Sequence, residues 1–419
     1  MSEETTGNKK SKIRILLVLD SLDYGGATRV NQDLTHLYKR ADFYVLTGIN
    51  NFFTSLRKEF RCKNFFTFPV WKRSNFTSYL STLLLTFIRL FQVLKNLDID
   101  VIVLNLPHSA LGAILNPLAW NKKKIFIFHG AWDAERRSLR EFFYSRESRK
   151  ILQPRDLFFE VKNKIEYIIQ KAAMQFSSFV VVFSEYSKSL VKNYYKVGKE
   201  KIKKLPPIIN VFSKDYYLPL RKPGCVSFLV PSRIEPRKGI HLVVEAINLL
   251  HNMKTERFEV VFTGPALSEG YLLYLIKRCK ETNLFNYVRF IRVFGRKELF
   301  ALYRKADCVI MPSVDLETLG MVTLESLSCG TPVIGFDRCA TPEILRKVDD
   351  RLIVAKLSVK ELAKRMKWFV NLSNKEKEVL ARKAMQEFRL FSDRKRLQSY
   401  LDELFGSQST RPTIIEPHP

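Results

Sequence analysis

The sequence is poor in cysteine, and none of its six cysteines forms a C-x-x-C pair. A thiolate metal site usually has such closely spaced pairs, so none is indicated, and we interpret the cysteines as reduced core residues of a protein in a reducing compartment. Cys308 lies in the apolar run ADCVIMP, which is typical of a reduced residue in a protein core. The sequence also lacks a G-x-G-x-x-G segment, which argues against a nicotinamide or flavin dinucleotide site.

Long apolar runs are missing as well. The best candidate, residues 79–94 (YLSTLLLTFIRLFQVL), is interrupted by Arg89, and it is shorter than the roughly 20 residues that a membrane-spanning helix needs. We interpret it as a helix that is either buried or lying in a membrane interface. The N-terminus has no apolar stretch of the kind found in signal peptides. We therefore expect a cytoplasmic protein, and a peripheral position at the inner face of the membrane is compatible with that expectation.

Acidic residues are scarce, because 42 Asp and Glu stand against 70 Lys and Arg, a formal net charge of +28. Such a field attracts polyanions, which include nucleic acid, anionic lipid headgroups and phosphate-bearing substrates. Residues 57–73 mix cations with aromatics just before the apolar helix. They are typical either of a sheet edge or of a patch that meets an anionic membrane surface. No nucleic-acid motif accompanies them, so nucleic acid is the least favoured partner.

Short apolar runs alternate with helical patterns, which predicts an α/β fold built from doubly wound parallel sheets. One set of runs precedes the proline-rich segment 205–224 and a second set follows it. The expected strands are 14–19, 43–46, 101–105, 125–128 and 179–183, then 226–231, 258–263, 287–291, 307–311 and 332–336.

The same patterns divide the chain into two Rossmann-like domains, as its length also favours. They cover residues 12–210 and 225–385, with a linker at 211–224 and further helices at 386–405. We expect disordered tails at 1–11, which is basic, and at 406–419. Ligands of such sheets bind at the carboxyl ends of the strands, so the loops there are the candidate site.

Two glutamates, Glu317 and Glu325, lie eight residues apart in the segment 312–337. Along a helix they would be roughly 12 Å apart, whereas a glycosidase carboxylate pair needs about 5–9.5 Å. We therefore expect them to hold two parts of one elongated ligand. Gly320, Met321 and Val322 would begin a helix whose free backbone N–H groups form an anion site.

Two cations flank a loop at the end of a predicted strand. Arg233 and Lys238 lie in PSRIEPRKG, and a guanidinium fork beside an ammonium point charge suits a diphosphate. Gly25 and Gly26 follow the first strand and would let backbone approach a phosphate at a helix start. His129 ends the strand run IFIFH, where a residue of the cleft is expected.

Asp98 and Asp100 form a D-x-D pattern, which is used for metal binding in other proteins. Here the pattern precedes the strand VIVLN, and the amino end of a strand is the wrong end for a ligand site in these sheets. We interpret it as a turn and expect no metal site.

The spacing E-x7-E, followed by SCGTPVI, resembles the retaining glycosyltransferases of family 4, or glycosyl transferases group 1. These have the GT-B fold, in which two Rossmann-like domains face an interdomain cleft. The resemblance covers about residues 13–385. It implies that Glu317 contacts hydroxyls of the donor sugar, that Glu325 contacts the ribose, and that the amides between them contact sugar and phosphates.

Other roles follow from the same resemblance. Arg233 and Lys238 would grip the diphosphate, Gly25 and Gly26 would close on it from the N-terminal domain, and His129 would lie near the transferred sugar. The last helix would cross back to the N-terminal domain.

The chain departs from the family pattern near the expected base contact. Arg292 stands where the family usually has glycine, just ahead of Val293, whose backbone would meet the base. Leu319 replaces a usual aromatic.

We therefore expect a retaining, metal-independent hexosyltransferase that uses no cofactor and takes a UDP- or GDP-linked sugar as its donor. The acceptor would be a saccharide or a lipid-linked saccharide. Two alternatives stay open: a nucleotide-sugar epimerase on the same fold, and a non-catalytic protein that binds polyanions through its basic surface.

Overall fold

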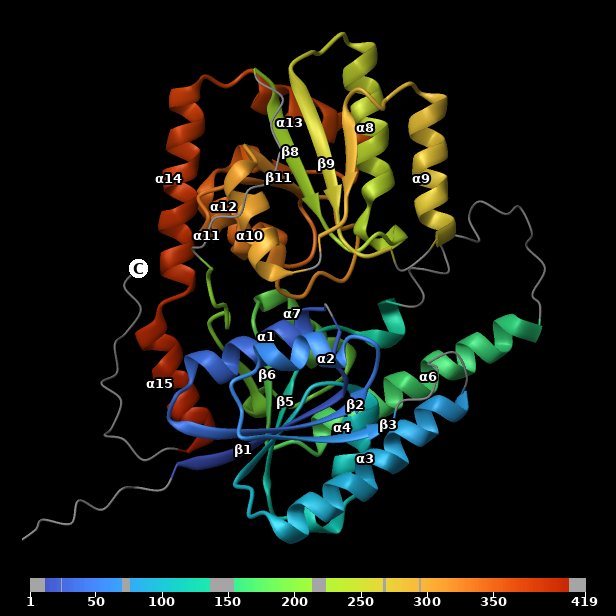
Figure 1. Cartoon of the computed structure of the whole chain (residues 1–419), viewed down its shortest axis with the longest axis vertical. Coiled ribbons are helices and arrows are strands. Elements are labelled where there is room, and N and C mark those ends of the chain that lie inside the picture. Colours follow the sequence, from blue (N-terminus) through green and yellow to red (C-terminus); the bar gives the residue numbers. More distant parts are fainter. Residues whose placement is uncertain are drawn as a thin grey trace, which may run out of the picture.

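The computed structural model describes residues 12–23, 25–69, 76–135, 154–212, 224–266, 269–293 and 295–406. The tails expected at 1–11 and 406–419 and the linker expected at 211–224 fall almost wholly outside these residues. The described chain forms two α/β domains, one above the other in Figure 1.

The sheet of the N-terminal domain has seven parallel strands in the order β3-β2-β1-β4-β5-β6-β7. Its central strands are apolar on both faces because helices cover both. In β1, Ile15 and Leu17 face one core, whereas Leu16 and Val18 face the other. The strands are β1 (Ile13–Ser21), β2 (Ala41–Ile49), β3 (Asn64–Pro69), β4 (Val101–Leu104), β5 (Lys123–Ile127), β6 (Phe179–Val182) and β7 (Ile202–Lys204).

The second sheet has six parallel strands in the order β10-β9-β8-β11-β12-β13. Both sheets start at a central strand, grow to one side and then return to the other, which is the doubly wound topology expected from the sequence. The strands are β8 (Val226–Pro231), β9 (Phe258–Thr263), β10 (Val288–Ile291), β11 (Cys308–Met311), β12 (Val333–Phe336) and β13 (Ile353–Val354).

Helices cover the two faces of the N-terminal sheet. Val30 and Leu34 of α1 pack on one face, and Leu90 and Val93 of α3 pack on the other, where α4 and α6 also lie. No helix in the described part of the chain has the length and apolar character needed to cross a bilayer. The helices and single turns are α1 (Gly26–Leu37), α2 (Phe53–Leu56), η1 (Arg57–Glu59), α3 (Phe76–Asn96), α4 (Pro107–Ile114), η2 (Pro117–Ala119), α6 (Pro154–Gln175), α7 (Glu185–Ser189), η3 (Leu190–Tyr194) and η4 (Lys199–Lys201).

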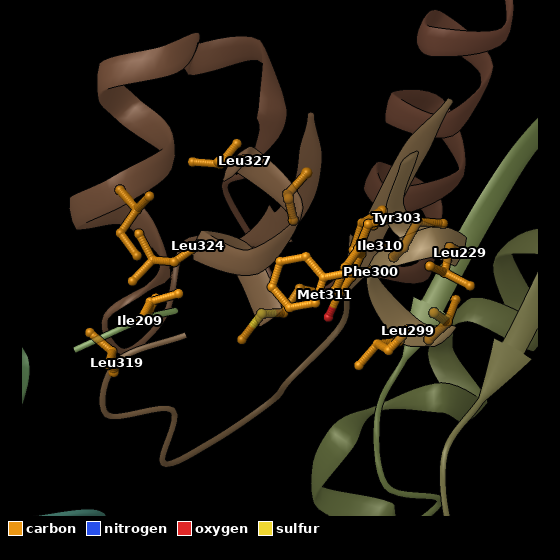
Figure 2. Packing of buried hydrophobic residues seen from close by; sticks show 14 of the residues in the cluster. Ile209, Leu229, Leu299, Phe300, Tyr303, Ile310, Met311, Leu319, Leu324 and Leu327 are labelled. Atoms are coloured by element: carbon orange, nitrogen blue, oxygen red, sulfur yellow. The ribbon is translucent and has the colours of Figure 1, made fainter. Parts of the chain in front are cut away.

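The C-terminal domain packs its helices around a core that Figure 2 shows from close by, with Leu229 of β8, Phe300 of α10, Ile310 of β11 and Leu324 of α11 among its members. This core fixes the two helices that carry site residues. The elements are η5 (Pro236–Lys238), α8 (Ile240–Asn252), α9 (Glu269–Glu281), α10 (Arg296–Lys305), α11 (Met321–Ser328), α12 (Thr341–Val348), η6 (Asp350–Leu352), α13 (Val359–Val370), α14 (Asn374–Phe391) and α15 (Arg394–Phe405).

The last two helices run from the C-terminal domain to the N-terminal one (Figure 1). The Tyr38 hydroxyl donates to Asp402 at 3.0 Å, and the Tyr38 ring lies 5.2 Å from that of Phe405. Helix α14 crosses residue 385, the expected end of the C-terminal domain, and continues to Phe391. Asp393 then caps the start of α15.

Candidate functional site

The two carboxyl edges of the sheets meet through direct contacts between their loops. The Thr318 hydroxyl, after β11, donates to the backbone carbonyl of His129, after β5, at 2.8 Å. Backbone N–H groups of Glu185 and Tyr186, at the start of α7, donate to Glu343 of α12 at 2.8 Å each. The candidate site therefore lies between the domains, as the switch-point rule predicts.

The loop after β8 carries the two predicted cations. Arg233 lies 3.1 Å from the Glu235 carboxylate, and Lys238 ends the 3-10 turn before α8. Gly239 then adopts φ +65°, and a Cβ there would lie 2.0 Å from the carbonyl oxygen of Pro312. Only glycine combines this conformation with so close an approach, so the β8 and β11 loops are held against each other.

Lys238 and Glu317 form an ion pair across this joint, with Nζ 2.6 Å from Oε2. Burial is the largest cause that lowers the pKa of Lys238; the Glu317 carboxylate opposes this shift, and the guanidinium groups of Arg237 and Arg233 add to it. Burial opposes ionisation of Glu317, but Lys238 and Arg237 offset it and leave the pKa of Glu317 below its usual value. Lys238 thus stays close to a carboxylate while its own charge is disfavoured by burial, and an anionic ligand beside it would favour the ammonium form.

Glu317 does not lie on a helix, contrary to the spacing argument from the sequence. It belongs to the loop between β11 and α11, where Leu316 has φ +56° and Gly320 has φ +75°. Gly320 is the residue before the first turn of α11. The helical estimate of the distance between Glu317 and Glu325 therefore does not apply. A positive φ at Gly320 opens the helix start and leaves the backbone N–H groups of its first turn available to an anion.

Glu325 is fully buried on α11, with an exposed fraction of 0%. Its carboxylate accepts from the Tyr303 hydroxyl at 3.1 Å and from Arg29 of the N-terminal domain at 3.3 Å. Arg296 lies 3.5 Å away. A buried carboxylate needs such partners, and Arg29 shows that α1 reaches into the C-terminal domain at this point.

The sequence did not reveal the residues that join the domains beside Glu325. Arg296 donates to both oxygens of Asp33, at 2.6 and 2.9 Å, and both side chains are buried. Arg29 follows the Gly25–Gly26 pair by one helical turn, and this position beside a predicted phosphate loop is the only local signal for it. Its pairing with Glu325 depends on the tertiary fold and leaves no local signal.

Gly25 and Gly26 lie at the end of the loop after β1, where α1 begins. The Gly25 N–H donates to Asp23 at 2.8 Å. A Cβ on Gly26 would have no atom within 4 Å, so this glycine faces open space. The glycine pair thus lies at the carboxyl edge, with open space beside Gly26 and the Asp23 carboxylate beside Gly25.

His129 lies just after β5, partly buried, with Nε2 2.9 Å from Oδ1 of Asn105. Burial lowers the pKa of His129 to about 3, so the imidazole is neutral at physiological pH. A bond from Nε2–H to the amide oxygen leaves Nδ1 as the acceptor. This histidine can orient or polarise a neighbouring group, but it is not a ready proton donor.

The remaining predicted contacts cluster at the same edge. Met321 and Val322 form the first turn of α11, and Val293 follows β10; all three are partly buried against the core. Arg292 is exposed. Phe294, which would complete this loop, lies outside the described residues.

Arg237 and Asp98 lie outside the predicted site contacts. Arg237 is buried and pairs with Glu135 of the N-terminal domain at 3.4 Å. Asp98 pairs with Arg14 at 2.7 Å and with Lys122 at 3.0 Å, before β4 begins. Within the described ranges, no group of three or more His, Cys, Asp or Glu is placed to hold a metal ion.

Two doubly wound domains that face each other through the carboxyl edges of their parallel sheets are the architecture of the GT-B class of protein. The comparisons agree. Residues 24–211 match the model of Glycosyltransferase Family 4, and residues 222–387 match that of Glycosyl transferases group 1. The chain belongs to the glycosyltransferases of this family 4 type.

Curated relatives match over part of their length. A D-inositol 3-phosphate glycosyltransferase of Jonesia denitrificans is 36% identical over 108 residues, 25% of each chain. A probable sucrose-phosphate synthase of Thermosipho melanesiensis is 28% identical over 190 residues, 42% of this chain and 43% of that protein. The matched segments thus cover a quarter of the first relative's length and less than half of the second's.

Solved structures match the fold over nearly the whole chain. Alr3699/HepE of Anabaena, in complex with UDP and glucose, has a TM-score of 0.72 at 16% identity, covering 94% of this chain and 100% of that one. WaaG, a glycosyltransferase involved in lipopolysaccharide biosynthesis, has a TM-score of 0.65 at 16% identity, with coverage of 94% and 100%.

Proposed function

We propose that the protein is a retaining glycosyltransferase that moves a hexose-type sugar from a nucleoside diphosphate to a saccharide acceptor. The observation that carries this proposal is the ion pair of Lys238 and Glu317 at 2.6 Å, between the β8 and β11 loops. It places a cation for a diphosphate directly beside a carboxylate for sugar hydroxyls. This is the junction that a nucleotide sugar would occupy.

The sugar donor would extend from this junction toward α11. Arg233 and Lys238 would bind the diphosphate, Glu317 the hexose, and Glu325 the ribose after its release from Arg29. The Alr3699/HepE structures with UDP and UDP-glucose support a uridine nucleotide, and a GDP-mannose-dependent mannosyltransferase of Mycolicibacterium smegmatis, 31% identical over 119 residues, supports a guanosine one.

Departure of the diphosphate is the step that needs stabilisation. Arg233, Lys238 and the N–H groups of the first turn of α11 supply fixed positive potential where negative charge develops, so we propose a reaction that needs no metal and no cofactor. Neutral His129 would orient or polarise the reacting groups rather than protonate them. The acceptor would approach from the N-terminal domain and attack the face that the diphosphate leaves, which retains the anomeric configuration.

A thermal-shift experiment tests the sugar-donor site. UDP or GDP at 100 times its dissociation constant should stabilise the protein by about 2.7 kcal/mol, with or without chelator. Lys238→Ala removes a charged contact worth about 1.5–3 kcal/mol, so most of the shift should vanish. Lys277→Ala is the control, because Lys277 is 77% exposed on α9.

Two outcomes would reject the nucleotide-sugar site. One is a UDP or GDP shift of equal size in Lys238→Ala and wild type. The other is the absence of any nucleotide shift together with stabilisation by single-stranded nucleic acid, which would favour a polyanion-binding protein.

We further propose that the N-terminal domain works at an anionic membrane surface, which suits a lipid-linked acceptor. Leu80, Leu84, Ile88 and Phe91 are 58%, 52%, 42% and 39% exposed and lie on one side of α3, four or three residues apart. The helix contains no acidic residue. An apolar stripe without negative charge, on a chain of net charge +28, is suited to anionic lipid. Sedimentation with vesicles tests this surface.

A further inference from the structure

The inner face of α6 is polar, although helices that cover a sheet normally bury apolar side chains. Asn163, Glu166 and Gln170 lie three and four residues apart and therefore share one side of the helix. They are 0%, 2% and 1% exposed. This side of α6 packs in the region of α4, with which the helix makes its main described contact.

Two more buried polar groups face the same place. His108, at the start of α4, lies with Nδ1 3.0 Å from Oδ2 of Asp20, near the end of β1, and with Nε2 4.0 Å from Oε1 of Glu166. The other Asp20 oxygen accepts the Ser109 N–H at 2.9 Å. A carboxylate, an imidazole and a second carboxylate thus form a row at the junction of β1, α4 and α6.

This row belongs to the edge of the sheet where the site lies. The Gln170 amide donates to the carbonyl of Gly130, the residue after His129, at 2.6 Å. Because α6 is a crossover helix that ends just before β6 begins, it runs opposite to the strands. Glu166 and Asn163 therefore lie successively further toward the carboxyl edge than Gln170. The polar face of α6 therefore begins beside the His129 segment.

Asn163 is the residue that the protein's own contacts do not explain. Its side chain is fully buried, yet neither Nδ2 nor Oδ1 has a hydrogen-bond partner among the described residues. Buried amides are nearly always satisfied, and an unsatisfied one costs free energy. A carboxamide presents two donor hydrogens and an acceptor oxygen, which can serve neighbouring hydroxyls of a polyol.

We propose that Asn163, together with Glu166 and the Asp20–His108 pair, forms the subsite for the neutral, hydroxyl-rich part of the acceptor; this rests on the proposed transferase function. Carboxylates accept hydrogen bonds from sugar hydroxyls and repel phosphate. The subsite therefore selects an uncharged sugar or cyclitol ring, and any phosphate of the acceptor binds elsewhere on the basic protein.

The test compares sugar binding in Asn163→Leu and Asn163→Ala with the wild type, all saturated with UDP. Saturation-transfer NMR would measure the dissociation constants of methyl α-D-glucopyranoside, methyl α-D-mannopyranoside and myo-inositol. Thr86→Val is the matched control, because Thr86 of α3 is also fully buried with an unpartnered hydroxyl in the described structure. We expect at least one neutral ring to bind the wild type and Thr86→Val equally, and at least tenfold more weakly to both Asn163 variants, with UDP affinity unchanged.

Equal sugar affinity in the Asn163 variants and the wild type would overturn the proposal. Asn163 would then be a structural residue, also if its replacement raises Tm without changing sugar binding. Failure of every neutral ring to bind the UDP-loaded wild type also overturns it. Failure of the transferase proposal is separate, because the wild type would then not bind UDP or GDP at all.

Discussion

At the scale of single residues, the candidate site is a buried cluster of paired charges. Lys238 pairs with Glu317, whereas Arg233 pairs with Glu235 and Arg237 with Glu135. Burial is the main cause that lowers the pKa of Lys238 below its ordinary 10.5, although Glu317 favours the charged form. A diphosphate would add negative charge beside this ammonium group and would favour its charged form further.

This charge predicts how nucleotide affinity depends on pH. A diphosphate binds the ammonium form of Lys238, so the dissociation constant of UDP should rise as pH increases through the lowered pKa. The phosphates of UDP do not contribute, because their last pKa is about 6, but the uracil N3–H also loses its proton in alkaline solution and affects wild type and variant alike. Calorimetric titrations between about pH 7 and pH 10 should show the loss of affinity in the wild type. Lys238→Ala should bind more weakly throughout and with a smaller alkaline decline; an equal decline in that variant would assign it to another group.

The sequence predicted these residues unevenly, for a physical reason. Glu317, Glu325, Arg233 and Lys238 belong to local patterns at strand ends, where the fold class already indicates ligands. The sequence could not show that Asp33 pairs with Arg296, which lies 263 positions further along the chain. It also gave no sign that Asn163 lacks a partner, because burial and satisfaction are properties of packing.

At the scale of secondary structure, long apolar or periodic segments were predictable and short ones were not. Strands β8 and β9 match their expected ranges, and β1 runs slightly beyond its expected range at both ends. β7 has three residues and β13 has two. Strands this short do not show a recognisable alternation of apolar and polar residues. The distance estimated from helical spacing does not hold for Glu317, because Leu316 and Gly320 have positive φ and keep Glu317 in a loop before α11.

Helix α3 carries a prediction of its own. Wild-type protein should sediment with vesicles of phosphatidylcholine that contain about 30% phosphatidylglycerol, since anionic lipid adds electrostatic attraction to apolar insertion. Leu84→Ser with Ile88→Ser should weaken this binding at least tenfold, because burying each side chain contributes about 1.5–3 kcal/mol. The control is Leu273→Ser with Ile276→Ser, because Leu273 and Ile276 are 65% and 36% exposed on α9 of the other domain. Equal loss in both pairs, or no loss in the α3 pair, would contradict the membrane proposal.

At the scale of the whole molecule, the two domains are joined by buried polar contacts at the site itself. Arg296 with Asp33 and Arg29 with Glu325 cross between them, and Glu325 is inaccessible while they do. Binding of a ribose at Glu325 therefore requires the domains to separate and Arg29 to leave. α14 and α15 connect the same two domains at their side (Figure 1), so such a movement would bend the chain near Ser392.

The central claim is transfer with retention from a nucleotide sugar, and water can serve as the acceptor in its most direct test. The protein would be incubated with UDP-glucose and with GDP-mannose, and proton NMR would follow the anomeric signals from the first minutes, before mutarotation. We expect slow consumption of one sugar donor, with the α-anomer of the free hexose appearing first and Lys238→Ala nearly inactive. First appearance of the β-anomer would contradict retention, and the persistence of both sugar donors, or their consumption at the wild-type rate by Lys238→Ala, would contradict the transferase site itself.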